Sequence, residues 1–511
     1  MRSQTPTILI TAAMLLLAAC TGGHGTGPGR AGSGSASPDS ALSAQVSPPH
    51  ASTTVVGERA PGALSLAVSR ELFDSARAVV VAGAGDERGI STAAEQAKRL
   101  GVPLLLDDGT EAAAAALKAE IGRLKAASVL AVGAETSGRL SDPSGPPVVA
   151  DPGQMSSPQR PDGLDSVAVL VRSGGDAATR AGAAAVTATA TAAGAGVIAV
   201  RGADPRADPE AIAALAKRRP EQVLASDPSF GPVGRLSARL AVAATGRQLP
   251  GGGQVVLPGR RLVAMYGHPG TGALGVLGEQ PVDAAIARAK RLAAPYRALS
   301  GSLPVVPAFE IIATVAQGGP GPDGDFSFEA PVSQLRPWVE KAGAAGLYVV
   351  LDLQPGRANF LDQAKRYEPL LTLPYVGLAL DPEWRLAPNQ RPLGQIGSAS
   401  AREINSVYQW LADLTKRNTL PQKLFVLHQF RLSMIGTDRP LDRSRDEVAL
   451  LIHMDGQGAP SLKDTTWHAV VGAAPKGVPF GWKNFYDEDK PMLTPAQTMS
   501  KRPTPVMISY Q

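Results

Sequence analysis

The sequence predicts an α/β protein in which a duplicated parallel α/β module precedes a (β/α)8 barrel. Two observations support this fold class. Between about residues 55 and 245, short apolar stretches alternate with alanine-rich stretches, and the same order of elements returns after about ninety residues. The remaining C-terminal region is about 250 residues long, the usual size of such a barrel, and contains eight candidate strands.

The composition is that of a globular protein with a large core. The chain has 511 residues, of which 44% are hydrophobic and 19% are charged. The formal net charge is only +5, and the basic residues are scattered along the chain. Because nucleic-acid binding needs clustered positive charge, we expect no nucleic-acid partner.

The N-terminus predicts export. Arg2 precedes the apolar run ILITAAMLLLAA, which ends at Cys20 and is too short to span a bilayer comfortably. LAAC, residues 17–20, resembles the bacterial lipobox. This resemblance implies a signal peptide over residues 1–19, lipidation of Cys20 and a membrane anchor on the extracytoplasmic face. An ordinary signal peptide is the alternative. Cys20 is the only cysteine, so the chain has no internal disulfide.

Residues 20–54 predict a disordered tether. The segment is rich in glycine, serine and proline and has almost nothing to bury. About thirty flexible residues have a root-mean-square reach of about 30 Å, which would hold the folded part away from a membrane surface.

Residues 55–245 predict two copies of one α/β unit. Apolar strands that alternate with helices indicate parallel sheets covered on both faces. The first copy is predicted from strands at 76–83, 102–108 and 127–133 and helices at 91–101 and 111–125. The second copy is predicted from strands at 165–174, 196–202 and 222–228 and helices at 177–194, 209–218 and 234–246.

The first copy resembles a known surface-protein module. VVVAGAGDERGISTAAEQAKRLGVPLLL and LKAEIGRLKAASVLAVG are similar to the type 2 cell-wall-binding repeat of Gram-positive surface proteins. Arg88, Gly89 and Ile90 replace the usual Phe-Pro-Asp turn, and we find two modules where the family typically has three. The resemblance implies a cell-wall or extracellular polysaccharide as partner. In GAGDERG the third glycine is one place late for a dinucleotide site, so we expect a tight turn and no cofactor.

Residues 260–511 predict a TIM barrel. The candidate strands are 261–268, 303–312, 347–354, 375–384, 423–430, 448–456, 467–473 and 505–511, and the clearest helices are 282–301, 332–343 and 401–417. Nearly every candidate strand begins apolar and ends polar, and barrel enzymes build their active sites at this C-terminal mouth. The polar and aromatic residues at the strand ends are Tyr266, His268, Glu310, Asp352, Gln354, Asp381, Glu383, His428, Gln429, His453, Asp455, Trp482, Lys483, Tyr486 and Tyr510.

The fourth candidate strand, GLALDPEW over 377–384, carries the most specific signal. Gly377, Ala379, Asp381 and Glu383 share one face, so small residues leave space beneath two carboxylates. Buried carboxylates without partners cost several kcal/mol, so a cluster of them is normally bound, paired or catalytic. A rim of ion pairs on a barrel without activity is the alternative.

GLALDPEW resembles the fourth strand of glycoside-hydrolase barrels. It is most similar to the Asp-x-Asp-x-Glu strand of the family-18 chitinase group, with Ala379 in place of the first acid. The resemblance implies that Glu383 is the proton donor and Asp381 the middle acid. Because the first acid is missing, a general two-carboxylate mechanism is the safer expectation, with Asp455, Asp352 or Glu310 as the second carboxylate.

The remaining strand-end residues are candidates for substrate binding. Trp384, Trp482 and Tyr486 would stack on sugar rings. The other candidates are Tyr266, His268, Gln354, His428, His453 and Tyr510.

Two other functions stay open. His268, His428 and His453 with the acids would suit a metal-dependent hydrolase, but no H-E-x-x-H motif supports a metal site. The other open function is that of a surface lipoprotein whose barrel binds glycan without cleaving it.

Overall fold

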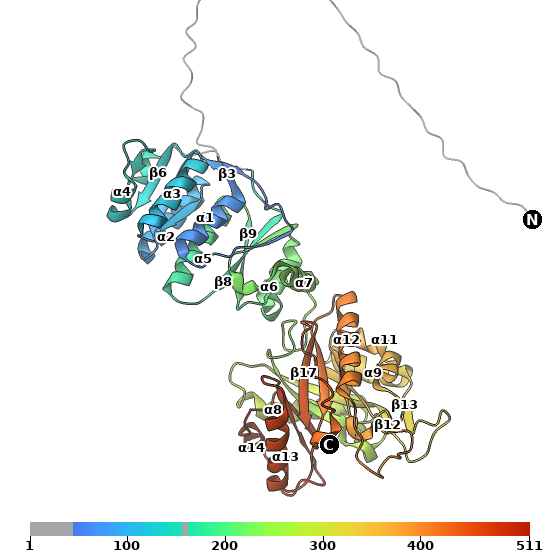
Figure 1. Cartoon of the computed structure of the whole chain (residues 1–511). Coiled ribbons are helices and arrows are strands. Elements are labelled where there is room, and N and C mark those ends of the chain that lie inside the picture. The colour runs from blue at the N-terminus through green and yellow to red at the C-terminus, as the bar shows by residue number, and fades with distance from the viewer. Residues whose placement is uncertain (1–43, 156–161) are drawn as a thin grey trace, which may run out of the picture. The chain divides into compact units, whose positions relative to one another are not determined.

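The computed structural model describes residues 44–155 and 162–511 and is a mixed α/β protein with parallel sheets and a closed barrel (Figure 1). The predicted signal peptide, Cys20 and the first part of the predicted tether lie outside the described residues. Within the part of the chain that the structure describes, no helix is both long enough and apolar enough to cross a membrane.

The first parallel sheet has the strand order β5-β4-β6-β7. Its elements are β4 (Ala78–Gly83), α2 (Glu87–Leu100), β5 (Leu104–Asp107), α3 (Glu111–Arg123), β6 (Ser128–Val132), α4 (Ala134–Leu140) and β7 (Val148–Val149). Asp86 and Thr110 cap α2 and α3 by accepting hydrogen bonds from backbone N–H groups of the first turn. The first strand of the copy, β4, therefore lies between the second and the third.

The second parallel sheet has the order β2-β10-β8-β9. Its elements are β8 (Val167–Ser173), α5 (Ala177–Ala192), β9 (Gly196–Arg201), α6 (Pro209–Arg218), β10 (Gln222–Ala225) and α7 (Val233–Ala243), with β2 (Thr53–Val55) at the edge. Here too the first strand, β8, lies between the second and the third. The two sheets thus agree in strand direction and in the order of their first three strands.

Helix α5 joins the two sheets into one core. It packs against α1 (Pro61–Leu72) and α2, and its buried residues are mostly alanines. Ala181 and Ala185 contact the core of the first sheet, while Val186 and Ala190 belong to the core that both sheets share. Small side chains let the helices approach closely, which explains the alanine-rich sequence.

The predicted tether is too long. β1 (Ala44–Val46) pairs antiparallel with β3 (Phe73–Ala76), and β2 pairs parallel with β10. Ala44 and Thr53 are buried. These short strands are stabilised by partners far away in the sequence, so the local glycine- and serine-rich composition gave no sign of them.

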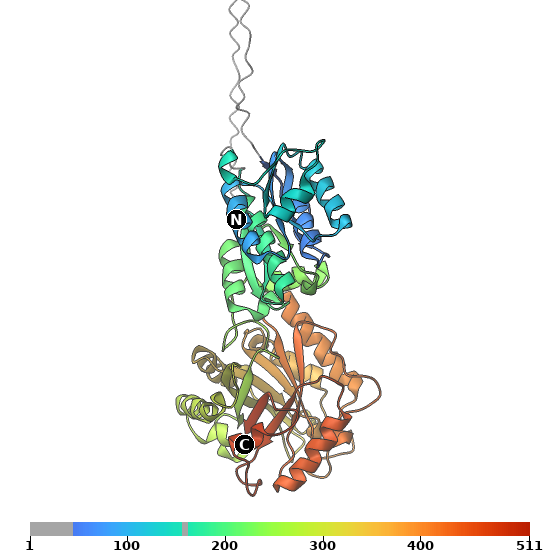
Figure 2. The same cartoon turned by 90° about the vertical axis from the view of Figure 1, so that its left-hand side faces the viewer.

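Residues 261–510, all of them described, contain eight parallel strands that close into a TIM-like barrel, with helices outside it (Figure 2). The strands are β11 (Arg261–Gly267), β12 (Val305–Ala316), β14 (Tyr348–Leu353), β15 (Val376–Leu380), β16 (Lys423–His428), β17 (Val448–Met454), β18 (Phe480–Asn484) and β19 (Met507–Tyr510). Pairing of β19 with β11 closes the ring. β13 (Ser327–Glu329) adds an antiparallel hairpin to β12.

The barrel helices are α8 (Val282–Arg297), α9 (Val332–Ala344), α10 (Phe360–Arg366), α11 (Glu368–Leu371), α12 (Ala401–Arg417), α13 (Pro460–Ala473) and α14 (Pro495–Met499). Three of them, α8, α9 and α12, match the three that the sequence predicted most clearly, and the other four were not among them. The alternation predicted for β15 is confirmed, because Leu378 and Leu380 pack toward the helices while Ala379 belongs to the barrel interior.

The predicted seventh strand, 467–473, is wrong. This segment is the second half of α13, and the seventh strand is β18, over Phe480–Asn484. Lys463, Trp467 and Val470 are buried at helical spacing, and Pro460 begins the helix at a position where proline is favoured. The β-branched and aromatic residues of the segment suggested a strand, but its buried residues recur at helical spacing and the segment forms a helix.

Candidate active site

The acids at the barrel mouth come from neighbouring strands. The parallel register places Tyr266 beside Glu310 and His428 beside His453. Asp381 follows the last residue of β15. Small residues below, such as Ala379 on β15, leave room for polar side chains above them. The fold therefore gathers these groups at the C-terminal ends of the strands.

His428 is the centre of the cluster. Its Nδ1 lies 2.9 Å from Asp455 Oδ2 and its Nε2 lies 2.9 Å from Glu310 Oε1, and the side chain is fully buried. Because both ring nitrogens face carboxylate oxygens, both donate, and the ring is an imidazolium. Burial alone would lower the pKa of this imidazole, but the charges of Asp352 and Glu310 and the bond to Asp455 raise it well above its usual value.

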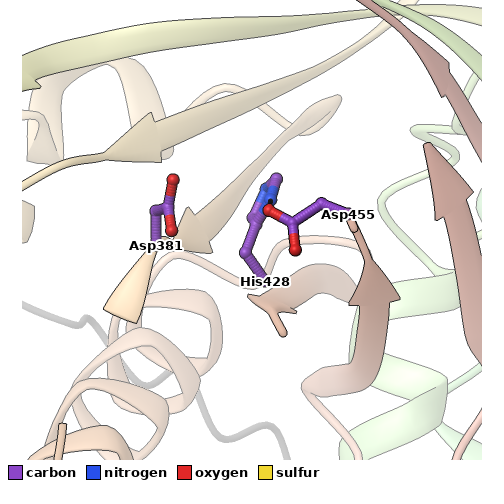
Figure 3. A group of neighbouring side chains, drawn as sticks. All are labelled: Asp381, His428 and Asp455. Atoms are coloured by element: carbon purple, nitrogen blue, oxygen red, sulfur yellow. Dashed lines mark hydrogen bonds and ion pairs between the residues drawn. The ribbon is translucent and has the colours of Figure 1, made fainter. Parts of the chain in front are cut away.

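Asp381, His428 and Asp455 converge from three adjacent strands (Figure 3). One side-chain ligand atom of each lies within 4.8 Å of those of the other two. Asp381 is buried, and its Oδ1 has no hydrogen-bond partner among the described residues. Burial raises the pKa of Asp381 well above its usual value, and the charge of Glu383 acts in the same direction.

Glu383 lies two residues beyond Asp381, in the short 3-10 turn η6 (Pro382–Trp384), and its side chain is only partly buried. Burial raises the pKa of Glu383 to about 7, and the negative charge of Asp455 adds to this shift. Burial would also raise the pKa of Asp455, but its hydrogen bond with His428 lowers that pKa below its usual value. The site therefore holds a carboxyl that keeps its proton near neutral pH beside a carboxylate that stays ionised.

Asp352 lies on the opposite side of His428 from Asp455 and accepts a hydrogen bond of 2.7 Å from the Tyr266 hydroxyl. Gln354 Nε2 donates to that hydroxyl at 3.3 Å, and Lys483 Nζ lies 3.4 Å from the centre of the Tyr266 ring. Burial raises the pKa of Asp352 to about 6, although the charge of His428 acts against this. Tyr266 thus links Asp352 to Lys483.

His453 forms a second layer behind His428. The two rings meet edge-on with centres 5.3 Å apart, and His453 Nε2 lies 2.7 Å from Ser509 Oγ. Burial lowers the pKa of His453 well below its usual value, and the charge of His428 adds to this. A Cβ at Gly481 would lie 1.9 Å from His453 Nδ1, so only glycine leaves space for this ring.

Four carboxylate oxygens of this cluster are buried without a hydrogen-bond partner in the described part of the chain. They are Glu310 Oε2, Asp352 Oδ1, Asp381 Oδ1 and Asp455 Oδ1. Buried acceptors of this kind are rare in native proteins and are costly for the fold.

Several predicted binding residues lie away from the cluster. Trp482 is fully buried against Trp467 of α13, with ring centres 5.5 Å apart, so no face of its ring is open to a sugar. Tyr510 is buried toward α8, where its hydroxyl lies 2.6 Å from that of Tyr296. His268 Nδ1 lies 2.8 Å from the carbonyl oxygen of Ile312 and does not join His428.

Two aromatic side chains remain accessible. Trp384 follows Glu383 directly and is partly buried, with no partner for its Nε1 among the described residues. Tyr486 is exposed, with its ring 5.8 Å from that of Tyr510. Gln429 is buried next to His428 in the sequence, and its backbone N–H donates to the His453 carbonyl.

Lys483 and Ser509 are two residues of the site that the sequence analysis did not predict as catalytic or substrate-binding. Lys483 lies on β18, which was not predicted as a strand, and Ser509 lies on β19. The two residues pair across these strands and face the barrel interior, where Lys483 contacts Tyr266 and Ser509 contacts His453. Their neighbours in the sequence, Trp482 and Ile508, therefore point outward. Lys483 could have been identified from the alternation of inward and outward residues along FGWKN, residues 480–484, if this segment had been predicted as a strand.

Two groups of carboxylate or histidine side chains in the described ranges have the spacing of metal ligands. One is Asp381, His428 and Asp455, and the other is Asp323, Asp325 and Glu329 at the β12–β13 hairpin. A histidine binds a metal through a free lone pair, whereas both nitrogens of His428 are engaged by carboxylates. The geometry of the first group therefore favours proton chemistry over metal binding.

Neither a scan against protein-family models nor a search of curated proteins finds a match to this chain.

Proposed function

We propose that the barrel hydrolyses glycosidic bonds in a cell-wall or extracellular polysaccharide. One observation carries this proposal. Glu383 is partly exposed at the end of β15, burial and the negative charge of Asp455 raise its pKa to about 7, and the hydrogen bond between Asp455 and His428 lowers the pKa of Asp455. An acid that keeps its proton beside a carboxylate that has lost it is the pair that glycoside hydrolysis needs.

Each member of the pair has a distinct role in this mechanism. Glu383 donates its proton to the glycosidic oxygen as the bond to the leaving sugar breaks. Asp455, held ionised by His428, either attacks the anomeric carbon to form a glycosyl-enzyme that water then hydrolyses, or takes a proton from the water that attacks this carbon directly. Asp352 and Glu310, the other candidates for this role, are fully buried and are less suited to contact a substrate.

The sequence resemblance supports the choice of glycan as substrate class. GLALDPEW is similar to the fourth strand of glycoside-hydrolase barrels, and Trp384 beside Glu383 would offer an apolar surface to a sugar ring. The absence of the first acid, at Ala379, argues against the substrate-assisted mechanism of the family-18 group.

The N-terminal half suggests where the enzyme works. We infer that the lipobox-like segment directs lipidation of Cys20 and anchors the protein on the extracytoplasmic face of the membrane. We further infer that the two α/β units arose by duplication, a view that their common strand order supports, and that they bind the cell wall. Replacing Cys20 with serine should move the protein from the membrane fraction to the medium.

The catalytic proposal is tested with Glu383→Gln. This isosteric change removes the transferable proton, so we expect glycan hydrolysis, measured as new reducing ends from a panel of wall and extracellular polysaccharides, to fall at least about 100-fold. Circular dichroism and glycan affinity should stay near wild type. The matched control is Glu488→Gln, which removes an exposed acid beyond β18. Full activity of Glu383→Gln would contradict the mechanism, and glycan binding by wild type without cleavage would favour the binding-only function.

A further inference from the structure

The two α/β units differ in how one edge of their sheets is covered. β5 in the first sheet and β9 in the second occupy equivalent positions, because each follows the first helix of its unit and pairs with the first strand as the edge strand of its sheet. Leu104 pairs with Val80, the third residue of β4, and Val197 pairs with Val169, the third residue of β8. Leu104 and Val197 are therefore equivalent, and so are the residues two positions further along each strand.

Helix α5 covers this edge in the first sheet. Leu104 and Leu106 are buried in a core to which Ala181 and other alanines of α5 belong. The Thr189 hydroxyl of α5 accepts a hydrogen bond of 3.1 Å from the backbone N–H of Leu104. The Ser65 hydroxyl of α1 accepts one of 2.9 Å from the N–H of Leu106. Helices with small side chains thus cover both the apolar side chains of the edge strand and its outer backbone groups.

The equivalent edge of the second sheet is open in the described part of the chain. Val197 is only partly buried and Ala199 is exposed, and β9 is the last strand of its sheet. Both side chains line a groove of about 580 Å³ whose other walls are α2 and α5, with Ala184 and Thr187 of α5 among its lining residues. Proteins normally protect an edge strand of valine, isoleucine and alanine from the surroundings. The groove is therefore the place on the second sheet that α5 takes on the first.

Helix α2 is the helix of this chain that corresponds to α5. Each follows the first strand of its unit, and Asp86 and Asp176 cap them in the same way, by accepting a hydrogen bond from the N–H three residues further on. Glu87, Ser91 and Glu95 form an exposed stripe on α2 and line the groove. A helix α2 that enters the groove of another copy therefore meets the α2 of that copy, and both copies make the same contact.

We propose that a second copy of this chain docks in this groove, with α2 of each copy against α5 and β9 of the other and the two α2 helices antiparallel across a two-fold axis. Charge supports this occupant. Arg172 and Arg180 line the groove and are opposite in charge to Glu95 of an incoming α2. Arg180 pairs with Glu87 of its own copy at 2.9 Å, but both side chains are exposed, and such pairs exchange partners at little cost.

The order of charges along α2 fits the antiparallel arrangement. Ser91 and Ala94 are small residues near the middle of the helix, where two helices can cross closely. When the crossing lies between them, Glu87 in the first turn of one α2 lies beside Lys98 in the last turn of the other. Two-fold symmetry repeats this contact, so the dimer gains the pair twice.

Sedimentation equilibrium of the purified Cys20→Ser chain tests for the dimer, because lipidation cannot then bring copies together. We expect a species of twice the mass of one chain at concentrations on the order of 10–100 µM. Ala199→Arg places a long charged side chain in the groove from an exposed position, so it should weaken the dimer at least about 10-fold. The matched control is Ala112→Arg, at an exposed position of α3 away from the groove, which should leave the association unchanged.

An exchange of charges tests the antiparallel contact. Glu87→Lys and Lys98→Glu should each weaken the dimer about 10-fold, because each variant dimer contains the like-charge contact twice. The double variant restores opposite charges, so its affinity should return to within about 3-fold of wild type. Both residues lie on the surface of α2, so these variants decide the outcome if circular dichroism shows that Ala199→Arg does not fold.

Three results would overturn the inference. They are a chain that stays monomeric at about 100 µM, a dimer that Ala199→Arg weakens no more than Ala112→Arg does, and a double charge variant that associates as poorly as the single ones. A dimer that responds to both sets of variants as expected upholds it, whether or not the barrel cleaves glycan.

Discussion

Buried carboxylic acids have different hydrogen-bond partners in the α/β region and at the barrel mouth. Glu120 of α3 is buried, and it accepts hydrogen bonds from Ser69, Arg70 and Arg123 at 2.7–3.0 Å. Burial would raise the pKa of this carboxyl, but the bond with Arg123 and the other two bonds together lower it. Asp381 is as deeply buried, has no such partner in the described part of the chain, and has a raised pKa.

The same contrast extends to the other buried acids. In the α/β region Asp107 pairs with Arg139 and Asp208 pairs with Arg201, each at 2.8 Å. These three buried carboxylates of the α/β region each have an arginine partner, and Asp489 of the barrel has Lys463. The acids around His428 have no such arginine within residues 261–510, which is what we expect if they serve the proposed chemistry at a cost to stability.

The largest effect is expected from breaking the pairing of Glu120. Changing Arg70 and Arg123 together to methionine leaves a buried carboxylate with Ser69 as its only remaining partner, which should lower the free energy of unfolding by about 3 kcal/mol. Urea unfolding followed by circular dichroism measures this. The control is methionine at Arg77 and Arg88, which are exposed. A double variant as stable as this control would mean that the arginines do little for the fold.

The pH dependence of stability should have opposite signs in the two regions. The folded pKa of Glu383 is raised to about 7, so its contribution to stability is present below its unfolded pKa and is lost as pH rises toward 7. The folded pKa of Glu120 is lowered, so its contribution is present above its unfolded pKa and is lost as pH falls. Wild type should thus lose on the order of 2 kcal/mol relative to Glu383→Gln between about pH 4 and 8.

Thermal unfolding of wild type, Glu383→Gln and Glu120→Gln across this pH range measures both trends. Relative to Glu120→Gln, wild type should gain stability as pH rises through the acid range. Parallel pH profiles for the two variants would show that the two environments do not differ.

The smallest effect is expected at Asp381. Asp381→Asn is isosteric and removes a carboxyl whose Oδ1 has no partner within residues 44–155 and 162–511, so stability at neutral pH should change by less than about 1 kcal/mol or rise slightly. Chemical denaturation beside the Glu120→Gln variant is the measurement. A loss of 3 kcal/mol or more would show that Asp381 is an essential structural partner, and would weaken its assignment to the site.

The sequence predicted the central acids well because their positions follow from strand periodicity. The face shared by Gly377, Ala379 and Asp381 could be read directly from an unbroken apolar strand. His428 and Asp455 likewise end long apolar strands. Their hydrogen bond could not be predicted, because it depends on how two strands twist beside each other.

The predictions failed where a strand is defined by its partners and not by its own sequence pattern. FGWKN has five residues, and its register is set by pairing with β19 rather than by its own pattern. Trp482 was expected in the site because it follows the segment that was wrongly predicted as the seventh strand. In the structure Lys483 and Ser509 face the barrel interior, and their neighbours Trp482 and Tyr510 pack toward the helices. β1 and β2 were missed for the same reason, since their partners are distant in the sequence.

The closing pair of the barrel has a consequence for how the protein folds. β19 hydrogen-bonds to β11, so the last strand of the barrel pairs with the first, and almost the whole barrel sequence lies between them. Contacts between such distant segments form slowly, because a long loop must be ordered before the pairing stabilises it. Until this step we expect water to reach the acids around His428 through the open side of the barrel. The electrostatic penalty of the site is therefore imposed late in folding, after most of the helical shell has had the chance to form.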